Sequence, residues 1–448
     1  MKLSFFGACR MVTGSCYLLE HEGSKLLIDC GMIQGAHFSE KDNLAPFPFD
    51  PKDVDYIAIT HAHVDHCGRV PKLVKEGFNG EIVATHATLS FIELMLGDSV
   101  HVIQSEAEEH GHEPLYDEED VISTVQKFQG VEYHQKISLG PFSLEFYDAG
   151  HILGSSSIYI TAGGKTIVFS GDIGNPPVPL LKETEYLEQV DYVVMESTYG
   201  ARKHEASRDR SLLLKSAIYE TITMGGVLLI PAFSLERTQE VLYELNSLVE
   251  NEDIPKVPIF VDSPLAIKAT RLYPKYNHLF NKEAKYLLDS GDDLFDFPGL
   301  QMTETVKDSI KINNVKAPKI IMAASGMMQG GRIRHHLKRY LSDYKTQILI
   351  IGYQVEGSLG RKLLDGEKVV VIEKQEYTVK AKIRPIGAYS AHADKDQLMK
   401  WLTHNKPEIS KIWLTHGEEA GALELADTIT KTLGVITDVP EYGQEVEL

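Results

Sequence analysis

The sequence has only four cysteines, and their spacing indicates no disulfide bond between any two of them. Cys9, Cys16, Cys30 and Cys67 form no Cys-x-x-Cys pattern and are too sparse for the disulfide framework of a small secreted protein. We therefore expect a reduced, cytoplasmic protein. Cys67 adjoins a cluster of histidines, but we interpret it as a small packed side chain and not as a metal ligand.

Long apolar runs are also absent. No stretch is long enough to span a bilayer, and the N-terminus enters a strand-like segment directly, so we expect neither a membrane anchor nor a signal peptide. With 43% hydrophobic and 24% charged residues, the composition is that of a globular protein. A chain of 448 residues is too long for one core, which indicates two domains or three.

Basic residues are outnumbered by acidic ones. The 45 Lys and Arg residues face 64 Asp and Glu residues, which gives a net charge of −19. This balance disfavours a broad basic face for nucleic acid but does not exclude a local one. Part of the acidic excess lies in residues 106–120, where we expect a solvated surface. His110 and His112 belong to that stretch, and we assign them no catalytic role.

The sequence does contain a dense group of side chains that bind metals. Residues 61–66 read His-Ala-His-Val-Asp-His and directly follow the apolar, strand-like run 54–60. Imidazole and carboxylate donors at this density suit a divalent metal such as zinc. Four donors so close together cannot all reach one tetrahedral ion without strain. The string therefore indicates two adjacent ions that share further donors from elsewhere in the chain.

Four more donors follow short apolar strands in the same way as the string. They are His151, Asp172, Glu196 and His416. Strands of one sheet system can bring their ends to a common edge, where loops carry function on a rigid scaffold. We therefore expect these side chains to join those of the string in one site.

The pattern of expected strands and helices changes twice along the chain. Short strands separated by turns give way to apolar strands that alternate with helices, as in a parallel α/β sheet, and a β-rich texture then returns. We predict that residues 1–199 and 376–448 form one split domain, with an α/β domain of residues 200–375 inserted into it. In the first part we expect helices over 68–76 and from Ala87 to about His101.

These motifs together resemble the metallo-β-lactamase superfamily, whose fold is an αββα sandwich with a dinuclear zinc site. They are the string at 61–66, Asp29-Cys30-Gly31, Gly150-His151 and Gly171-Asp172. The inserted domain and the motifs around Glu196, His392 and His416 resemble the β-CASP nucleases, in particular the bacterial and archaeal homologues of the pre-mRNA 3′-end cleavage endonuclease subunit. The resemblance implies an α/β fold with a parallel-sheet β-CASP domain inserted into the sandwich.

The resemblance also implies two Zn²⁺ ions per chain as cofactors. One ion is held by His61, His63 and His151, the other by Asp65, His66 and His416, and both by Asp172. Two such ions generate a shared hydroxide nucleophile and stabilise the charge that develops on a phosphate under attack. In that arrangement Asp172 and Asp65 are catalytic as well as ligating, since Asp65 lies next to the hydroxide and orients it.

Three residues are expected to act beside the metals. His392 is the candidate general acid for the leaving oxygen, and Glu196 holds its imidazole and favours the protonated form. A structural histidine and a salt-bridged strand end are the respective alternatives, because structural networks also perturb acids. Asp29 is expected to hydrogen-bond the metal-binding loop and orient its histidines, with a turn-capping role as the alternative.

A glycine-rich turn in the inserted domain, residues 325–332, joins an apolar strand to a basic helix. Such turns present backbone N–H groups to phosphate, although this one matches no established nucleotide-binding fingerprint. We predict Ser325, Arg332 and Ser390 as phosphate or RNA contacts. A solvated helix face is the alternative for the basic helix.

The leading hypothesis is a zinc-dependent ribonuclease that hydrolyses single-stranded RNA and leaves 5′-phosphate and 3′-hydroxyl ends, as an endonuclease, a 5′-to-3′ exonuclease or both. A small-molecule metallohydrolase acting on a thioester or lactone is one alternative, which the insertion with Glu196 and His392 disfavours. A non-catalytic RNA-binding subunit is another, which the full ligand set disfavours. RNA is the expected partner, without membrane association, and a homodimer is compatible with the sequence.

Overall fold

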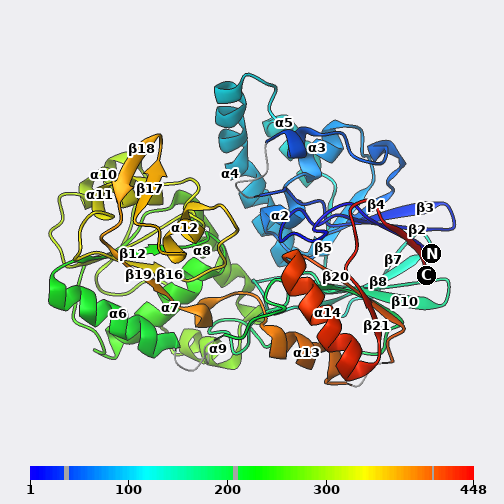
Figure 1. Ribbon diagram of the computed structural model, residues 1–448. Coiled ribbons are helices and arrows are strands. Elements are labelled where there is room, and N and C mark those ends of the chain that lie inside the picture. Colours follow the sequence, from blue (N-terminus) through cyan, green and yellow to red (C-terminus); the bar gives the residue numbers. More distant parts are fainter. Residues whose placement is uncertain (35–39, 205–209, 406–407) are drawn as a thin grey trace.

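The computed structural model describes residues 1–34, 40–204, 210–405 and 408–448, which form two lobes (Figure 1). One lobe combines the beginning of the chain, in blue and cyan, with its end, in red. The other lobe, mainly green and yellow, is built from the middle of the chain. None of the helices in the described ranges has the length and apolarity that a membrane crossing requires.

The first lobe contains two sheets, each of which combines strands from both ends of the chain. One sheet has the order β22 (Glu445–Glu447), β1 (Lys2–Phe5), β2 (Tyr17–His21), β3 (Ser24–Ile28), β4 (Tyr56–Ala58), β5 (Glu81–Thr85) and β6 (Phe128–Val131). The other has the order β21 (Ile436–Asp438), β20 (Lys411–Thr415), β11 (Tyr192–Glu196), β10 (Lys165–Phe169), β9 (Ser156–Ala162), β8 (Phe142–Asp148) and β7 (Ile137–Leu139).

The two sheets pack face to face because their strands present apolar side chains at alternate positions. Buried and partly exposed residues alternate along the whole of β8. The core between the sheets includes Phe5, Leu26, Phe146 and Trp413. On the outer faces, α4 (His86–His110) packs on β5 and β6, while α13 (Lys395–Thr403) and α14 (Glu419–Leu433) cover β20. This order of helix, sheet, sheet and helix confirms the predicted αββα sandwich.

The second lobe is built around a sheet whose strand pairings are all parallel. Its order is β14 (Leu300–Met302), β13 (Ile259–Val261), β15 (Lys319–Ala323), β12 (Val227–Pro231), β16 (Gln347–Ile350) and β19 (Lys382–Pro385). Helix α6 (Arg210–Met224) precedes the first of these strands, and the helices between them include α7 (Arg237–Glu250), α8 (Pro264–Leu272), α10 (Val306–Ile312), α11 (Ile333–Tyr340) and α12 (Leu359–Leu364). Every residue of β12, β15 and β16 is buried, as strands covered on both faces require. The inserted parallel-sheet α/β domain is thus confirmed.

Strand β19 lies beyond residue 375, which is the predicted end of the inserted domain, yet it pairs with β16 of that domain. Just before it, β17 (Val369–Ile372) and β18 (Gln375–Thr378) form a hairpin outside the three large sheets. This hairpin supplies the β-rich texture from which the sequence predicted a return to the sandwich. We therefore propose that the sandwich resumes after Pro385.

Two predicted helices differ in extent from those in the structure. Instead of one helix over 68–76, α2 (Val64–Cys67) and α3 (Val70–Lys75) are separated by a break, because Pro71 at the start of α3 cannot continue a preceding helix. Helix α4 runs past the predicted end near His101 to a left-handed cap at Gly111.

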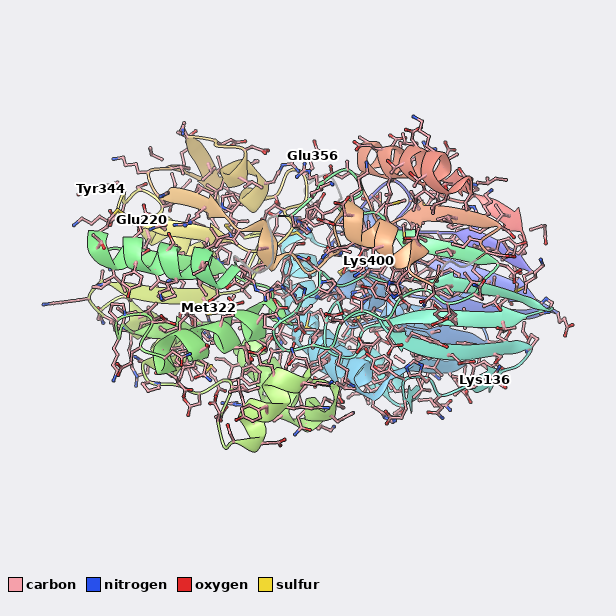
Figure 2. All side chains as sticks on the ribbon, turned by 90° about the horizontal axis from the view of Figure 1, so that it is seen from below. Lys136, Glu220, Met322, Tyr344, Glu356 and Lys400 are labelled. Carbon is pink, nitrogen blue, oxygen red and sulfur yellow. The ribbon has the colours of Figure 1, made fainter. Side chains whose placement is uncertain are left out.

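Helix α4 joins the two lobes. The ring of Phe91 lies 5.5 Å from that of Tyr273 and 6.4 Å from that of Tyr276, both in the inserted domain. The hydroxyls of Ser90 and Tyr276 are hydrogen-bonded at 2.5 Å. One apolar cluster accordingly continues from the sandwich into the inserted domain. The side chains in Figure 2 fill both lobes, with Lys136 toward the far end of the sandwich and Tyr344 toward the opposite end of the molecule.

The inter-sheet core predicts a large effect for Phe146→Ala. The side chain is fully buried, so its loss leaves a cavity and lowers the free energy of unfolding by about 3–5 kcal/mol. Val102→Ala on α4, where the side chain is 53% exposed, is the control and changes that free energy by about 0.5 kcal/mol or less. Urea unfolding followed by circular dichroism measures both, and equal midpoints would contradict the packing described.

Candidate metal centre

The predicted ligands meet where strands of both sheets end. The string follows β4, and Asp172 and His416 follow the parallel strands β10 and β20. His151 lies in the turn between β8 and β9. All seven predicted ligands fall into three overlapping groups of mutually close donor atoms, one of which also contains Glu196 and His392. The structure therefore brings together the side chains that the spacing of the strands led us to expect.

The first group has the dimensions of a tetrahedral metal site. Nδ1 of His63 lies 3.1 Å from Nε2 of His61 and 3.2 Å from Nε2 of His151. Oδ2 of Asp172 lies 3.3 Å from Nε2 of His61 and 3.4 Å from Nε2 of His151. Ligand atoms about 2.0 Å from a tetrahedral zinc ion are separated by roughly 3.3 Å. These four atoms fit one such ion.

The second donor group consists of Asp65, His66 and His416, and it faces the other oxygen of the Asp172 carboxylate. Oδ1 of this carboxylate lies 3.3 Å from Nε2 of His66, and Oδ2 of Asp65 lies 3.3 Å from Nε2 of His416. Nε2 of His66 and Oδ1 of Asp172 are buried, and neither forms a hydrogen bond with a described residue. These two atoms lie close to each other as an ion pair, and an unpaired buried polar atom costs about 1–3 kcal/mol, so a cation held between them would give each a further partner. The donor set fits a second metal that shares Asp172 with the first.

The outward-facing nitrogen of each of four histidines has a partner of its own. The pairs are His61 Nδ1 with Thr60 Oγ1 at 3.0 Å, His66 Nδ1 with Asp29 Oδ2 at 2.7 Å, His151 Nδ1 with the carbonyl O of Ala391 at 3.2 Å, and His416 Nδ1 with Thr198 Oγ1 at 3.1 Å. Such contacts fix the tautomer and ring orientation of metal-binding histidines. Asp29 lies where the sequence predicts it. Thr60 and Thr198 were not predicted, although each lies within two residues of a predicted site residue, because a search for ligand types passes over hydroxyls.

The loops around these histidines are tightly constrained. Asp29 and His416 have φ angles of 56° and 48°, which residues other than glycine rarely adopt. Gly31 is required for a different reason: a Cβ atom there would lie 1.6 Å from the carbonyl O of Asp65. The Asp29-Cys30-Gly31 motif and the string are thus two halves of one packed unit.

Burial keeps several of these imidazoles neutral. It lowers the pKa of His61 to about 3 and that of His63 to about 4, and it holds the pKa of His151 well below its ordinary value. A neutral imidazole has a free lone pair, which is the form that binds a metal. The first donor group is therefore prepared for a cation at neutral pH.

His392 is in the opposite state. Burial alone would lower its pKa, but the charges of Glu196 and Asp172 raise the pKa of His392 to about 9. Its Nδ1 lies 3.1 Å from Oε2 of Glu196, whose Oε1 also accepts a hydrogen bond from the backbone N–H of Ile173 at 2.6 Å. The His392 side chain is 14% exposed, so a protonated imidazole stands at the rim of the donor cluster.

The three predicted phosphate contacts lie in different environments. Ser390 is buried, and its hydroxyl oxygen accepts a hydrogen bond from the backbone N–H of His392 at 3.3 Å. Arg332 donates to Asp262 at 2.7 Å and to the carbonyls of Thr303 and Glu304. Both side chains therefore have partners within the protein, and both brace the loops on which they lie. The hydroxyl of Ser325 is partly exposed and accepts only a 3.3 Å hydrogen bond from Gly330 among the described residues.

Three family models match the chain in the order of its parts. They are the metallo-β-lactamase superfamily at residues 10–187, the Beta-Casp domain at 238–363 and the Zn-dependent metallo-hydrolase RNA specificity domain at 376–440. A ribonuclease of Thermus thermophilus is 38% identical over 448 residues, which cover 100% of this chain and 98% of the Thermus protein. The chain belongs to the β-CASP branch of the metallo-β-lactamase superfamily. Family and donor cluster together identify a metal-binding site in a metal-dependent hydrolase.

Other β-CASP relatives match over nearly the whole chain. An RNase J-like protein of Methanocaldococcus jannaschii is 32% identical and the alignment covers 98% of each chain. The transcription termination factor FttA of the same organism is 30% identical, with 98% of this chain and 70% of its own covered. A solved protein of unknown function from Enterococcus faecalis V583 has 12% identity and a TM-score of 0.56, covers 100% of this chain and 99% of its own, and shares the fold.

The contact between Asp29 and His66 predicts that Asp29→Ala weakens metal binding. Loss of the carboxylate frees the imidazole to rotate, and substitutions of this kind cost about 10–100-fold in metal affinity. Competition with a chromophoric chelator measures the affinity. Asp53→Ala, at an exposed position, is the control and leaves it unchanged. An Asp29→Ala protein that retains metal as tightly as the control would show that Asp29 only caps its turn.

Proposed function

We propose that this β-CASP protein is a zinc-dependent ribonuclease that hydrolyses single-stranded RNA. The observation that carries the proposal is the position of His392, held by Glu196, beside the donor cluster around Asp172. The arrangement offers a binding place for a phosphate and, next to it, an acid for the leaving oxygen. The RNA specificity domain and the relatives named as ribonucleases support RNA over a small thioester or lactone as the substrate.

The proposed cofactors are two Zn²⁺ ions, because the donors are imidazoles and carboxylates in near-tetrahedral spacing. One ion takes His61, His63 and His151, the other takes Asp65, His66 and His416, and Asp172 joins both. When bound, zinc ions supply Lewis acidity and lower the pKa of water. A complete donor set also argues against the alternative of a non-catalytic RNA-binding subunit.

The chain's own residues then complete the hydrolysis. The oxygen of a water molecule, which Asp65 orients with a side chain that is 16% exposed, bonds to the phosphorus, and the proton that this water loses passes to the solvent. The bond between phosphorus and O3′ breaks, and His392 donates its proton to O3′. The products are a 3′-hydroxyl and a 5′-phosphate. Glu196 keeps His392 protonated before the step and stabilises its orientation.

Ser325 remains the proposed phosphate contact from the inserted domain. Its partly exposed hydroxyl and the adjacent glycine N–H groups lie after β15, at the carboxyl edge of the parallel sheet, where open α/β sheets bind their ligands. Arg332, which is paired with Asp262, and Ser390, which is buried, stay predictions of the sequence. The homodimer and the cytoplasmic location stay predictions of the sequence.

Metal removal tests the proposed activity. The purified chain, incubated with 5′- and 3′-end-labelled single-stranded RNA, should cleave it to products with 5′-phosphate ends. EDTA should abolish cleavage and added Zn²⁺ should restore it, while elemental analysis should find about two zinc ions per chain. Asp172→Ala should lose both metal and activity because its carboxylate serves both donor groups. Cleavage that persists in EDTA would refute the proposal.

The acid assignment predicts two distinct effects. His392→Ala should keep its zinc yet lose about 10²–10⁴-fold in kcat, the usual contribution of a general acid. Wild-type activity should fall as the pH rises through the pKa of His392, because only the protonated form donates. Glu196→Gln removes the charge that raises this pKa, so its alkaline limb should lie at lower pH than that of the wild type. Identical pH profiles for the two proteins would remove Glu196 from this role.

A further inference from the structure

Three neighbouring strands of the inserted domain end side by side. Strand β12 lies between β15 and β16, and all three run parallel. The residues that follow them therefore meet at one edge of the sheet. Phe233 follows the middle strand, Gly326 follows one neighbour and Gly352 follows the other.

The ring of Phe233 occupies the space that these two glycines leave free. A Cβ atom on Gly326 would lie 2.6 Å from Cδ2 of the ring, and one on Gly352 would lie 3.0 Å from its Cε2. Any side chain at the first position, and most at the second, would displace the ring. The absence of two side chains thus sets the position of one aromatic group.

The ring also reaches the metal centre. Its centroid lies 6.5 Å from that of the His63 imidazole, which belongs to the first donor group. Phe233 is only partly buried, whereas its neighbours Ala232 and Ser234 are buried. A large apolar group left partly exposed beside a polar centre is placed to contact a ligand that enters that centre.

We propose that Phe233 is a substrate-binding residue, on whose ring the base of a nucleotide adjacent to the scissile phosphate stacks. The inference rests on the proposed ribonuclease function. Every base has a π-face, so stacking on an aromatic ring holds a single strand without selecting its sequence. It requires little positive charge, which suits a chain with a net charge of −19. Ser325, beside Gly326, contacts the phosphate, and Phe233 holds the base.

Ring removal and base removal together test the contact. Phe233→Leu keeps an apolar side chain but no ring, and Phe233→Tyr keeps the ring. After the wild-type cleavage position on a labelled single-stranded RNA is mapped, each nucleotide around it is replaced in turn by an abasic ribose. KM and kcat are measured for every pair of protein and RNA. Phe49→Leu, a partly buried aromatic position in the first lobe, is the matched control.

Stacking predicts that Phe233→Leu raises KM about 5- to 100-fold with kcat little changed, and that Phe233→Tyr and Phe49→Leu stay near the wild type. One abasic position should raise KM of the wild type by a similar factor but have little further effect on Phe233→Leu. Zinc content and thermal unfolding should match the wild type. Independent, multiplicative effects of the two changes, or loss of zinc or stability in Phe233→Leu, would overturn the inference. If the wild type itself fails to cleave RNA, the proposed function fails as well.

Discussion

The buried carboxylate of Asp172 is the group on which the rest of the site depends. One of its oxygens faces His61 and His151, and the other faces His66. A carboxylate removed from water is costly unless positive charge or hydrogen bonds compensate it, and here the nearest groups are imidazoles. Burial keeps two of these three imidazoles neutral. Burial would also lower the pKa of the third, His66, but the charges of Asp172 and Asp29 raise it, so the carboxylate is compensated by His66 and, when a cation is bound, by that cation. The strand ends and the partners of the outer nitrogens serve to hold this carboxylate and its imidazoles in place.

The two lobes supply different parts of that environment. The sandwich delivers the metal-binding side chains from strand ends, where short loops on rigid sheets restrict their movement. The inserted domain contributes groups that reach across to these loops. Adjacent residues at the start of α7 illustrate this: Glu236 accepts a hydrogen bond from the N–H of Leu153 at 3.0 Å, and Arg237 donates to the carbonyl O of Tyr389 at 2.7 Å. Each contact lies two or three residues from a histidine of the site.

Much of the fold and site could be predicted from the sequence because the relevant signals are local. The string at 61–66 and the donors after strands depend on residue type and on a strand period of two, and both are visible without tertiary information. The parallel sheet was visible for the same reason, in apolar runs alternating with helices. Recognition of the family added the pairing of each ligand with its ion.

What could not be predicted depends on contacts between distant residues. In the sequence, Arg332 lies at the start of the predicted basic helix, but only the structure shows that its guanidinium forms an ion pair with Asp262. The hairpin β17–β18 has the pattern of a sandwich strand pair, and the pairing of β19 with β16 is the reason why we propose that the insertion continues past it. Phe233 carries no ligand signature, and its surroundings come from residues almost a hundred positions or more away in the sequence, so no local pattern identifies it.

The pairing of chain ends has a consequence for synthesis. Strand β22 pairs with β1, and His416 reaches the centre on β20, beside β11. The ligands from the first half of the chain are therefore translated long before the last one, and the inserted domain is complete in between. A growing chain at that stage carries one full donor group and only part of the second. The protein therefore completes its donor set only after its last strands have emerged from the ribosome and paired with strands of the first half of the chain.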